Sequence, residues 1–178
     1  MRRAYSVHVF LTRSVGGERQ YLIFQRAPRD DLGLPAFFQG ISGALEDQES
    51  SQDAAVRKVF EETELRINRP IYSGFSHHYP IKEQWRKHYG AEPQQVEERV
   101  FTADISGMED PVLSAEHTSF RWLRLAEALP LRTYGANAEC LRRVDQLWSR
   151  AIGEAVPKQV RAKSIVSLSS NLLPSGSE

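Results

Sequence analysis

The sequence predicts an α/β protein in which a mixed β-sheet lies between helices. Segments rich in β-branched and aromatic residues, typical of strands, recur along the chain, and two longer segments, 50–65 and 135–152, repeat apolar residues at helical spacing. A chain of 178 residues accommodates one ordinary domain with a substantial core. We therefore expect one domain over residues 1–156 and a flexible tail over 157–178, where serine, lysine and small residues follow no clear period.

The first half of the chain predicts a hairpin, an irregular loop and a capped helix. Residues 4–12 and 20–26 are strand-like, and the turn glycines of SVGGER lie between them. The next stretch, APRDDLGLPAFFQGISG, is rich in turn-forming residues, which predicts a loop that returns to one short strand at 38–42. Ser50 and Asp53 then have the spacing of a capping box at the start of the first long helix.

The second half predicts the remaining strands and a closing helix. Strand-like residues occupy 70–81 and 96–105, and the polar stretch 82–94 between them is the best candidate for a variable loop at a binding pocket. A further strand at 119–124 precedes a short helix that Pro130 must end or interrupt. These strands would complete the sheet, and the helix at the end of the domain would cover it.

The charge balance and the N-terminus exclude some classes of protein. Basic and acidic side chains number 23 each, so the chain has no general attraction to nucleic acid or anionic lipid. The apolar stretch in MRRAYSVHVFLTRS is followed by Arg13 and Glu18 too soon for a membrane helix or a signal peptide. Cys140 is the single cysteine, which fits a reducing compartment. We expect a cytoplasmic protein that binds neither nucleic acid nor membrane; a homodimer is one open alternative for its oligomeric state.

The first long helix carries an acid pair beside a lysine. Lys58, Glu61 and Glu62 recur at intervals of three and four, so they share one region of the helix surface. One interpretation is a solvated face with ion pairs worth roughly a few tenths of a kcal/mol each. The other is a divalent-cation site, because Mg²⁺ prefers hard oxygen ligands and usually shares them with substrate phosphates. Helix composition alone favours the solvated face.

A longer set of spacings surrounds the acid pair. In chain order it reads Gly43, five residues, Glu49, seven residues, Arg57, one residue, Val59, one residue, Glu61 and Glu62, two residues, Leu65. These seven positions, in a predicted loop and helix, resemble the signature of Nudix hydrolases, G-x5-E-x7-R-E-U-x-E-E-x-G-U, where U is a bulky aliphatic residue. Downstream, EHTSFRWL at 116–123 is similar to the E-H-x-x-(Y/F)-x-W-L stretch of several Nudix groups.

This resemblance covers most of residues 4–150 and implies both a fold and an activity. The stretches LIFQRAPRDD, FFQGISGALE, SHHYP and TYGANAECL make the chain most similar to the bacterial dihydroneopterin triphosphate pyrophosphohydrolase group. The family implies a Nudix-type α/β/α sandwich and a diphosphatase, dependent on Mg²⁺ or Mn²⁺, in which water attacks a phosphorus of a small-molecule pterin or nucleoside polyphosphate. A dinucleoside tetraphosphate hydrolase and a non-catalytic nucleotide-binding sensor are the alternatives.

The resemblance also assigns roles to residues. It implies that Glu61, Glu62 and Glu116 bind the metal and carry catalysis, with Glu62 as the firmest ligand, and it leaves open which group positions the water. Structural roles fall to Gly43, Glu49 and Arg57: the glycine lets the backbone approach the metal closely, and the last two pair to fix the loop onto the helix.

Two positions depart from the family pattern. Lys58 replaces a glutamate, and an ammonium about 5 Å from a divalent ion costs several kcal/mol at an effective dielectric constant of about 20. We therefore expect fewer or weaker bound metals and reduced hydrolysis, unless Lys58 acts on a substrate phosphate as a point charge. Glu64 replaces a glycine, which costs about 1 kcal/mol if this residue adopts a left-handed conformation.

Substrate contacts are expected from Arg26, Ser42 and Asn137, with Arg2 or Arg3 near the same opening. These positions fall where the pyrophosphohydrolase group touches its ligand. Arginines at strand ends are otherwise most often solvated. 

Aromatic and histidine side chains offer weaker candidates. Phe38, Tyr79 and Trp85 have the ring systems to stack on a pterin or a base, although core filling is the commoner fate of aromatic residues on strands. His77 and His78 are neighbours on a predicted strand and point to opposite faces, so they do not form a simple metal site together.

Overall fold

The protein is described by a computed structural model that covers the chain except residues 1–2, 31–32, 90–91, 132–134 and 156–178. The chain separates into two compact units, residues 1–145 and 146–178. The first unit contains the sheet and the sites described below. The predicted tail, 157–178, lies outside the described residues, so the boundary at 156 stays a prediction.

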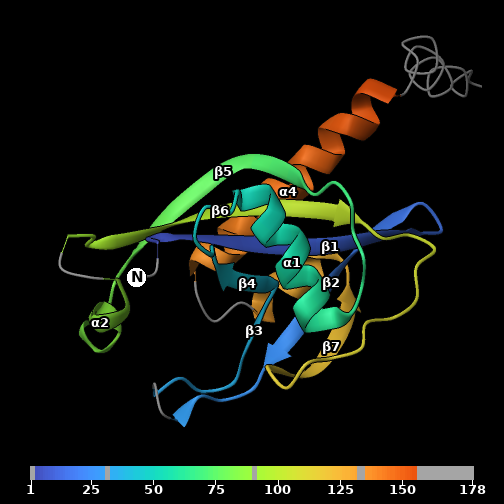
Figure 1. Ribbon diagram of the computed structural model, residues 1–178. Helices are drawn as coiled ribbons and strands as arrows, with labels where there is room; N and C mark the ends of the chain where they lie inside the picture. Colours follow the sequence, from blue (N-terminus) through green and yellow to red (C-terminus); the bar gives the residue numbers. More distant parts are fainter. Residues whose placement is uncertain (1–2, 31–32, 90–91, 132–134, 156–178) are drawn as a thin grey trace, which may run out of the picture. The chain divides into compact units, whose positions relative to one another are not determined.

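A mixed sheet of seven strands organises the first unit (Figure 1). In chain order the strands are β1 (Tyr5–Val15), β2 (Glu18–Arg26), β3 (Phe37–Gln39), β4 (Ile41–Ala44), β5 (Ile71–Pro80), β6 (Gln95–Asp104) and β7 (His117–Leu123). β1 and β6 are parallel, and the other neighbouring strands are antiparallel. The main path is β3-β2-β1-β6-β5, with β4 paired to β1 and β7 paired to β2.

The segment after the first hairpin differs from the single short strand predicted at 38–42. β1 and β2 pair only near their turn, from Thr12 with Tyr21 to Val15 with Glu18. Beyond that point β3 pairs with β2, and β4 pairs with β1. The predicted strand is therefore two short strands. β1 and β2 no longer pair with each other here, so the segment supplies hydrogen-bonding partners to each of them in turn. This arrangement brings β4 against the first half of β1.

Helices cover the sheet in the places the apolar periodicity predicts. α1 (Ser51–Thr63) lies in front of the sheet in Figure 1, and the beginning of α4 (Gly135–Ala155) lies behind it. The predicted pocket loop contains two short helices, η2 (Glu83–Trp85) and α2 (Arg86–Tyr89). α3 (Leu125–Ala128) and η3 (Leu129–Leu131) follow β7, and α3 ends before Pro130 as expected. Among the described residues no helix is long and apolar enough to span a membrane.

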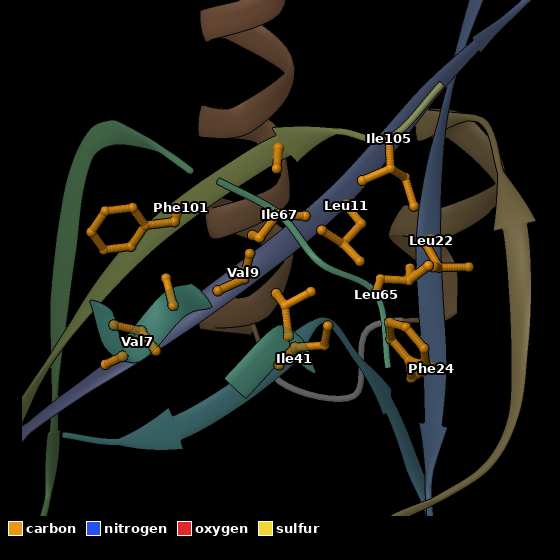
Figure 2. Packing of buried hydrophobic residues seen from close by; sticks show 14 of the residues in the cluster. Val7, Val9, Leu11, Leu22, Phe24, Ile41, Leu65, Ile67, Phe101 and Ile105 are labelled. Carbon is orange, nitrogen blue, oxygen red and sulfur yellow. The ribbon is translucent and has the colours of Figure 1, made fainter. Parts of the chain in front are cut away.

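The alternation of β1 separates the apolar core from a polar region. Val7, Val9 and Leu11 are fully buried in the core cluster that includes α1 (Figure 2). Each fully buried aliphatic side chain of this kind contributes about 1.5–3 kcal/mol relative to exposure. Ser6 and His8, which alternate with these residues along β1, are also buried, and His8 stacks on the fully buried Phe10 of the same face at 4.5 Å between ring centroids. β1 thus carries aliphatic core residues on one face, and the other face begins with the two polar residues Ser6 and His8.

Candidate active site

The helix α1 begins and ends with capping interactions that position the acid pair. The Ser50 hydroxyl accepts a hydrogen bond from the backbone N–H of Asp53 at 3.1 Å. At the other end Glu64 has a left-handed conformation with φ of 59°, and its N–H donates to the carbonyl of Phe60. The family pattern has glycine at this position, and the left-handed conformation explains that preference, because glycine adopts it without steric cost. In this chain Glu64 adopts it instead.

Arg57 fastens the preceding loop to the helix. Its guanidinium donates to both carboxylate oxygens of Glu49, at 2.7 Å each, and to the carbonyl of Ala44 at 3.1 Å. The hydrogen bond from Arg57 lowers the pKa of Glu49, and the bond to Glu49 raises the pKa of Arg57. The fork geometry fixes the loop from Ala44 to Glu49 relative to α1.

The two adjacent glutamates of α1 lie in different environments. The side chain of Glu62 is 2% exposed, and its Oε2 accepts a hydrogen bond from Nε2 of His117 at 2.7 Å. Glu61 is much more exposed and accepts from the guanidinium of Arg57 at 3.0 Å. The bond from His117 joins α1 to the start of β7, so it also places Glu116 near this end of the helix. Glu116 itself forms an ion pair with Arg26 at 3.6 Å.

Lys58 lies between the two glutamates of α1. Its Nζ is 3.0 Å from Oε2 of Glu61 and 3.2 Å from Oε1 of Glu62, and its side chain is 12% exposed. Burial opposes its charge, but Glu62, Glu61 and Glu116 outweigh burial, so the pKa of Lys58 is raised. Burial also opposes the charge of Glu61, yet the hydrogen bonds from Lys58 and Arg57 lower its pKa. The ammonium group of Lys58 and the guanidinium of Arg57 together therefore already balance the charges of the acid pair.

Gly43 makes room for this lysine. A Cβ atom at Gly43 would overlap the Cγ, Cδ and Cε atoms of Lys58. The space above the glycine backbone, which the family resemblance reserves for approach to a metal, is thus filled by the aliphatic part of Lys58. With any other residue at position 43, the Lys58 side chain would have to move from the place it takes here.

The acidic side chains do not form a divalent-metal site as they are arranged here. Within the described residues no group of three histidine, cysteine, aspartate or glutamate side chains is placed to hold a metal ion. Glu61 and Glu62 both contact the Lys58 ammonium, and Glu116 pairs with Arg26. The structure therefore brings the three predicted metal ligands around Lys58, where their charge stabilises an ammonium group.

A cavity of about 630 Å³ opens beside Lys58. Its described lining consists of Ser6, Arg26, Arg29, Leu34, Ser42, Gly43, Ala44, Lys58, Tyr79, Trp85, Lys87, His88, Tyr89 and Glu116. Two of the predicted substrate-binding residues, Arg26 and Ser42, are among them. Arg3 instead lines a neighbouring 440 Å³ cavity and donates to the carbonyl of Glu49 at 2.8 Å. Asn137, on α4, is not among the described residues of either lining. Arg2 lies outside the described residues.

Several lining residues were not predicted to contact substrate. Lys87, His88 and Tyr89 come from α2 and reach the cavity because η2 and α2 fold the polar stretch back toward β4. A buried carboxylate, Glu98, lies behind Ser6 and Ser42 and accepts hydrogen bonds from both hydroxyls. The sequence signal for this group is the appearance of Ser6 and His8 at alternate positions of an otherwise apolar strand.

Comparisons with known proteins place the chain in a family. The pattern of the NUDIX domain family matches residues 2–144. The chain belongs to the Nudix family. A dihydroneopterin triphosphate diphosphatase from Haemophilus influenzae is 29% identical over 126 residues, which is 68% of this chain and 76% of that protein. The E. coli dihydroneopterin triphosphate pyrophosphohydrolase structure has a TM-score of 0.63 at 23% identity and covers 80% of this chain and 94% of its own.

The Nudix assignment confirms the predicted family, its similarity to the dihydroneopterin triphosphate group and the predicted fold class. It supports the predicted enzyme class, a Nudix diphosphatase. An octanoyltransferase from Myxococcus xanthus is 30% identical over 139 residues, which is 78% of this chain. The chain spans 36% of the length of that relative, so the match concerns one part of a longer protein.

Proposed function

We propose that this Nudix protein hydrolyses a phosphoanhydride bond of a pterin or nucleoside polyphosphate. The charge of the 630 Å³ cavity carries the proposal. Arg26, Arg29, Lys58 and Lys87 line it together with one carboxylate, Glu116, among the described residues. Such an excess of cations is complementary to a polyphosphate chain, and arginine and lysine bind phosphate oxygens in different ways. The name of the H. influenzae relative supports a pterin triphosphate as one substrate.

The lining residues have distinct parts in this reaction. The guanidinium groups of Arg26 and Arg29 bind phosphate oxygens, and the ammonium of Lys58 acts as a point charge beside the phosphorus that is attacked. Negative charge that develops on the leaving phosphate is neutralised by these cations.

Glu116 is the residue that we assign to the water. Its side chain is 45% exposed and lines the cavity, and Arg26 holds it from one side at 3.6 Å. Glu61 and Glu62 are less suitable because both already accept contacts from Lys58. Glu116 accepts a hydrogen bond from the attacking water and orients it toward the phosphorus.

Magnesium enters this proposal with the substrate. Nudix hydrolases generally use divalent metals, and Mg²⁺ is usually bound by one or two carboxylates together with substrate phosphates. Because the ammonium of Lys58 lies between Glu61 and Glu62, we propose that Mg²⁺ or Mn²⁺ arrives on the polyphosphate and that Lys58 takes the place of a protein-held ion. The free protein then binds Mg²⁺ weakly.

A panel of polyphosphates scored by product identity tests the proposal. Dihydroneopterin triphosphate, nucleoside triphosphates and dinucleoside tetraphosphates are each incubated with Mg²⁺, and released phosphate, pyrophosphate and nucleotides are separated. Glu116→Gln is expected to lower kcat by about 100-fold or more, whereas Glu109→Gln, an exposed glutamate away from the cavity, leaves kcat unchanged. Equal rates in the two variants would contradict the role of Glu116.

Two alternatives are outcomes of the same panel. A dinucleoside tetraphosphate hydrolase yields two nucleotides without free pyrophosphate. A nucleotide-binding sensor binds a polyphosphate tightly and releases no product. The position of Lys58 between Glu61 and Glu62 favours the sensor over the dinucleotide enzyme, because this arrangement supplies binding charge in place of the metal site.

A further inference from the structure

A polar cluster spans four neighbouring strands beside the cavity. We define the Glu98 cluster as Ser6, His8, Ser42, His77, Tyr79 and Glu98. In the sheet register Ser6 is opposite Glu98, His8 is opposite Ser42, and His77 is opposite Glu98 on its other side. Three members, Ser6, Ser42 and Tyr79, line the 630 Å³ cavity. The cluster is therefore a part of the cavity wall with a buried carboxylate behind it.

Hydroxyl and imidazole groups surround the carboxylate of Glu98. Its side chain is 7% exposed. Oε1 accepts from the hydroxyls of Ser42 at 2.9 Å and Ser6 at 3.2 Å, and Oε2 lies 2.9 Å from Nε2 of His77 and 3.3 Å from Nδ1 of His8. Burial opposes the charge of Glu98, but the contacts from His77 and His8 outweigh burial and hold its pKa well below the ordinary value. Glu98 is an ionised group that only accepts hydrogen bonds.

The backbone fixes which nitrogen of His8 carries the proton. The N–H of Gly40 donates to Nε2 of His8 at 3.2 Å, so Nε2 must accept. In a neutral imidazole the proton then lies on Nδ1, the nitrogen that faces Glu98. Nε2 of His77 also carries its proton, because the carboxylate of Glu98 cannot donate. His77 therefore donates a hydrogen bond to Oε2, and Nδ1 of His8 lies 3.3 Å from the same oxygen.

This chain of donors determines what the cavity wall offers a ligand. A hydroxyl has one proton and two lone pairs. Ser6 and Ser42 direct their protons to Glu98, so only lone pairs remain on the cavity side. The Tyr79 hydroxyl lies 3.3 Å from the Ser6 hydroxyl. Tyr79 is the donor of that pair, because the Ser6 hydroxyl already donates its proton in the hydrogen bond to Glu98. The wall made by the two serines is thus composed of hydrogen-bond acceptors.

An acceptor wall repels phosphate and attracts N–H groups. Phosphate oxygens have no protons to donate at the serine hydroxyls, and the buried anion of Glu98 opposes a second anion. The polyphosphate therefore lies on the side of Arg26 and Lys58. Trp85 and Tyr89 line the same cavity and supply aromatic surface for a planar ring. A ring placed among these groups turns its hydrogen-bonding edge toward the serines.

We propose that the Glu98 cluster selects a 2-amino-4-oxo-pyrimidine ring, the ring that guanine and pterin share, and rejects adenine. This ring presents a ring N–H next to an amino group, two adjacent donors that match Ser6 and Ser42. Adenine presents its amino group next to a ring nitrogen whose lone pair would face the serine lone pairs. The inference rests on the proposed function, because it assumes that the polyphosphate binds in the 630 Å³ cavity.

Binding of non-hydrolysable nucleotides to the full chain tests the inference. Methylene-bridged analogues of GTP, ITP and ATP are titrated by calorimetry with Mg²⁺ present. The GTP analogue is expected to bind about tenfold more tightly than the ATP analogue, with the ITP analogue, which lacks the 2-amino group, between them. Ser42→Ala reduces the preference to about threefold, and Ser76→Ala, a serine of β5 outside the described lining, leaves it unchanged.

Glu98→Gln provides the sharper variant. Because Nε2 of His77 donates, the amide oxygen of this variant faces the histidines and its NH₂ group faces the serines. The serine hydroxyls then turn their protons toward the cavity, and the preference for the GTP analogue falls to about onefold or reverses. A thermal melt verifies that the variant is folded.

The possible results separate the inference from the proposed function. Equal binding of the GTP and ATP analogues by the wild-type protein, or a guanine preference that survives in both Ser42→Ala and Glu98→Gln, would overturn the inference. Turnover of GTP itself is measured on the same samples. Tight, guanine-selective binding without turnover of GTP or of any polyphosphate in the panel supports the inference and refutes hydrolysis, whereas turnover without base preference does the reverse.

Discussion

Glu62 on α1 and Glu98 on β6 are both buried carboxylates, and their partners differ in kind. Glu62 contacts a positive charge, the ammonium of Lys58 at 3.2 Å, and one imidazole, that of His117. Glu98 accepts hydrogen bonds from the hydroxyls of Ser6 and Ser42 and from the imidazole of His77, and the imidazole of His8 lies 3.3 Å away. One carboxylate is stabilised mainly by charge and the other mainly by directed hydrogen bonds.

This difference has a chemical consequence. A charged partner such as Lys58 offsets part of the negative charge of Glu61 and Glu62 without dictating the direction of any hydroxyl. A hydroxyl stabilises a carboxylate only by pointing its proton at it, so Glu98 fixes the orientation of Ser6 and Ser42. The first arrangement sets the charge beside the cavity, and the second provides selectivity for a hydrogen-bonding pattern.

The largest effect on this comparison is expected from Lys58→Met, which retains the aliphatic stem against Gly43 and removes the charge. Loss of one partner from a buried ion pair leaves Glu62 without its cation, so the free energy of unfolding should fall by about 3 kcal/mol. Urea denaturation measures this change. Lys87→Met, an exposed lysine of the same cavity, should change stability by less than about 0.5 kcal/mol. Equal losses in the two variants would show that Glu62 does not depend on Lys58.

An intermediate effect is expected at Glu98 and depends on pH. Its folded pKa lies below the ordinary value of 4.5, so its contribution is fully present above about pH 4.5 and is lost as pH falls through the folded pKa. Glu98→Gln should therefore be less stable than wild type by about 2 kcal/mol at neutral pH, and the difference should narrow near about pH 3.

Urea denaturation at several pH values measures the Glu98 effect. Glu97→Gln, the neighbouring residue paired with Arg99 at 3.0 Å near the surface, serves as the control and should show a much smaller difference at neutral pH. If the difference in the free energy of unfolding between wild type and Glu98→Gln grew as the pH fell, the assignment of Glu98 as ionised in the folded protein would be wrong.

The smallest effect is expected from Glu64→Gly at the end of α1. Glycine adopts the left-handed conformation that Glu64 has at φ of 59° without steric cost, so the free energy of unfolding should rise by about 1 kcal/mol. Glu64→Ala, which keeps a Cβ atom, should give no such gain. Thermal or urea denaturation distinguishes the two. Neither variant removes a contact of Glu62. The difference between Glu64→Gly and Glu64→Ala therefore measures the contribution of the end of α1 alone to the free energy of unfolding.

The sequence by itself determined the elements whose signals are local. The Ser50 cap, the apolar side of α1 and the spacing from Gly43 to Leu65 depend on residues close in the chain, and they predicted the first helix and the family. The hairpin of β1 and β2 was predicted for the same reason. The split of one expected strand into β3 and β4 was missed, because it depends on where β1 and β2 diverge.

Only the tertiary structure decided how the charges are neutralised. The spacing of Lys58, Glu61 and Glu62 fitted both a solvated face and a cation site; the fold buries Glu62 against His117, 55 residues away, and brings the lysine ammonium between the acids. The Glu98 cluster draws on four strands whose pairing no local pattern specifies. The directions of the hydrogen bonds to Glu98 depend on contacts between side chains of neighbouring strands. They can therefore be known only once the register of those strands is known.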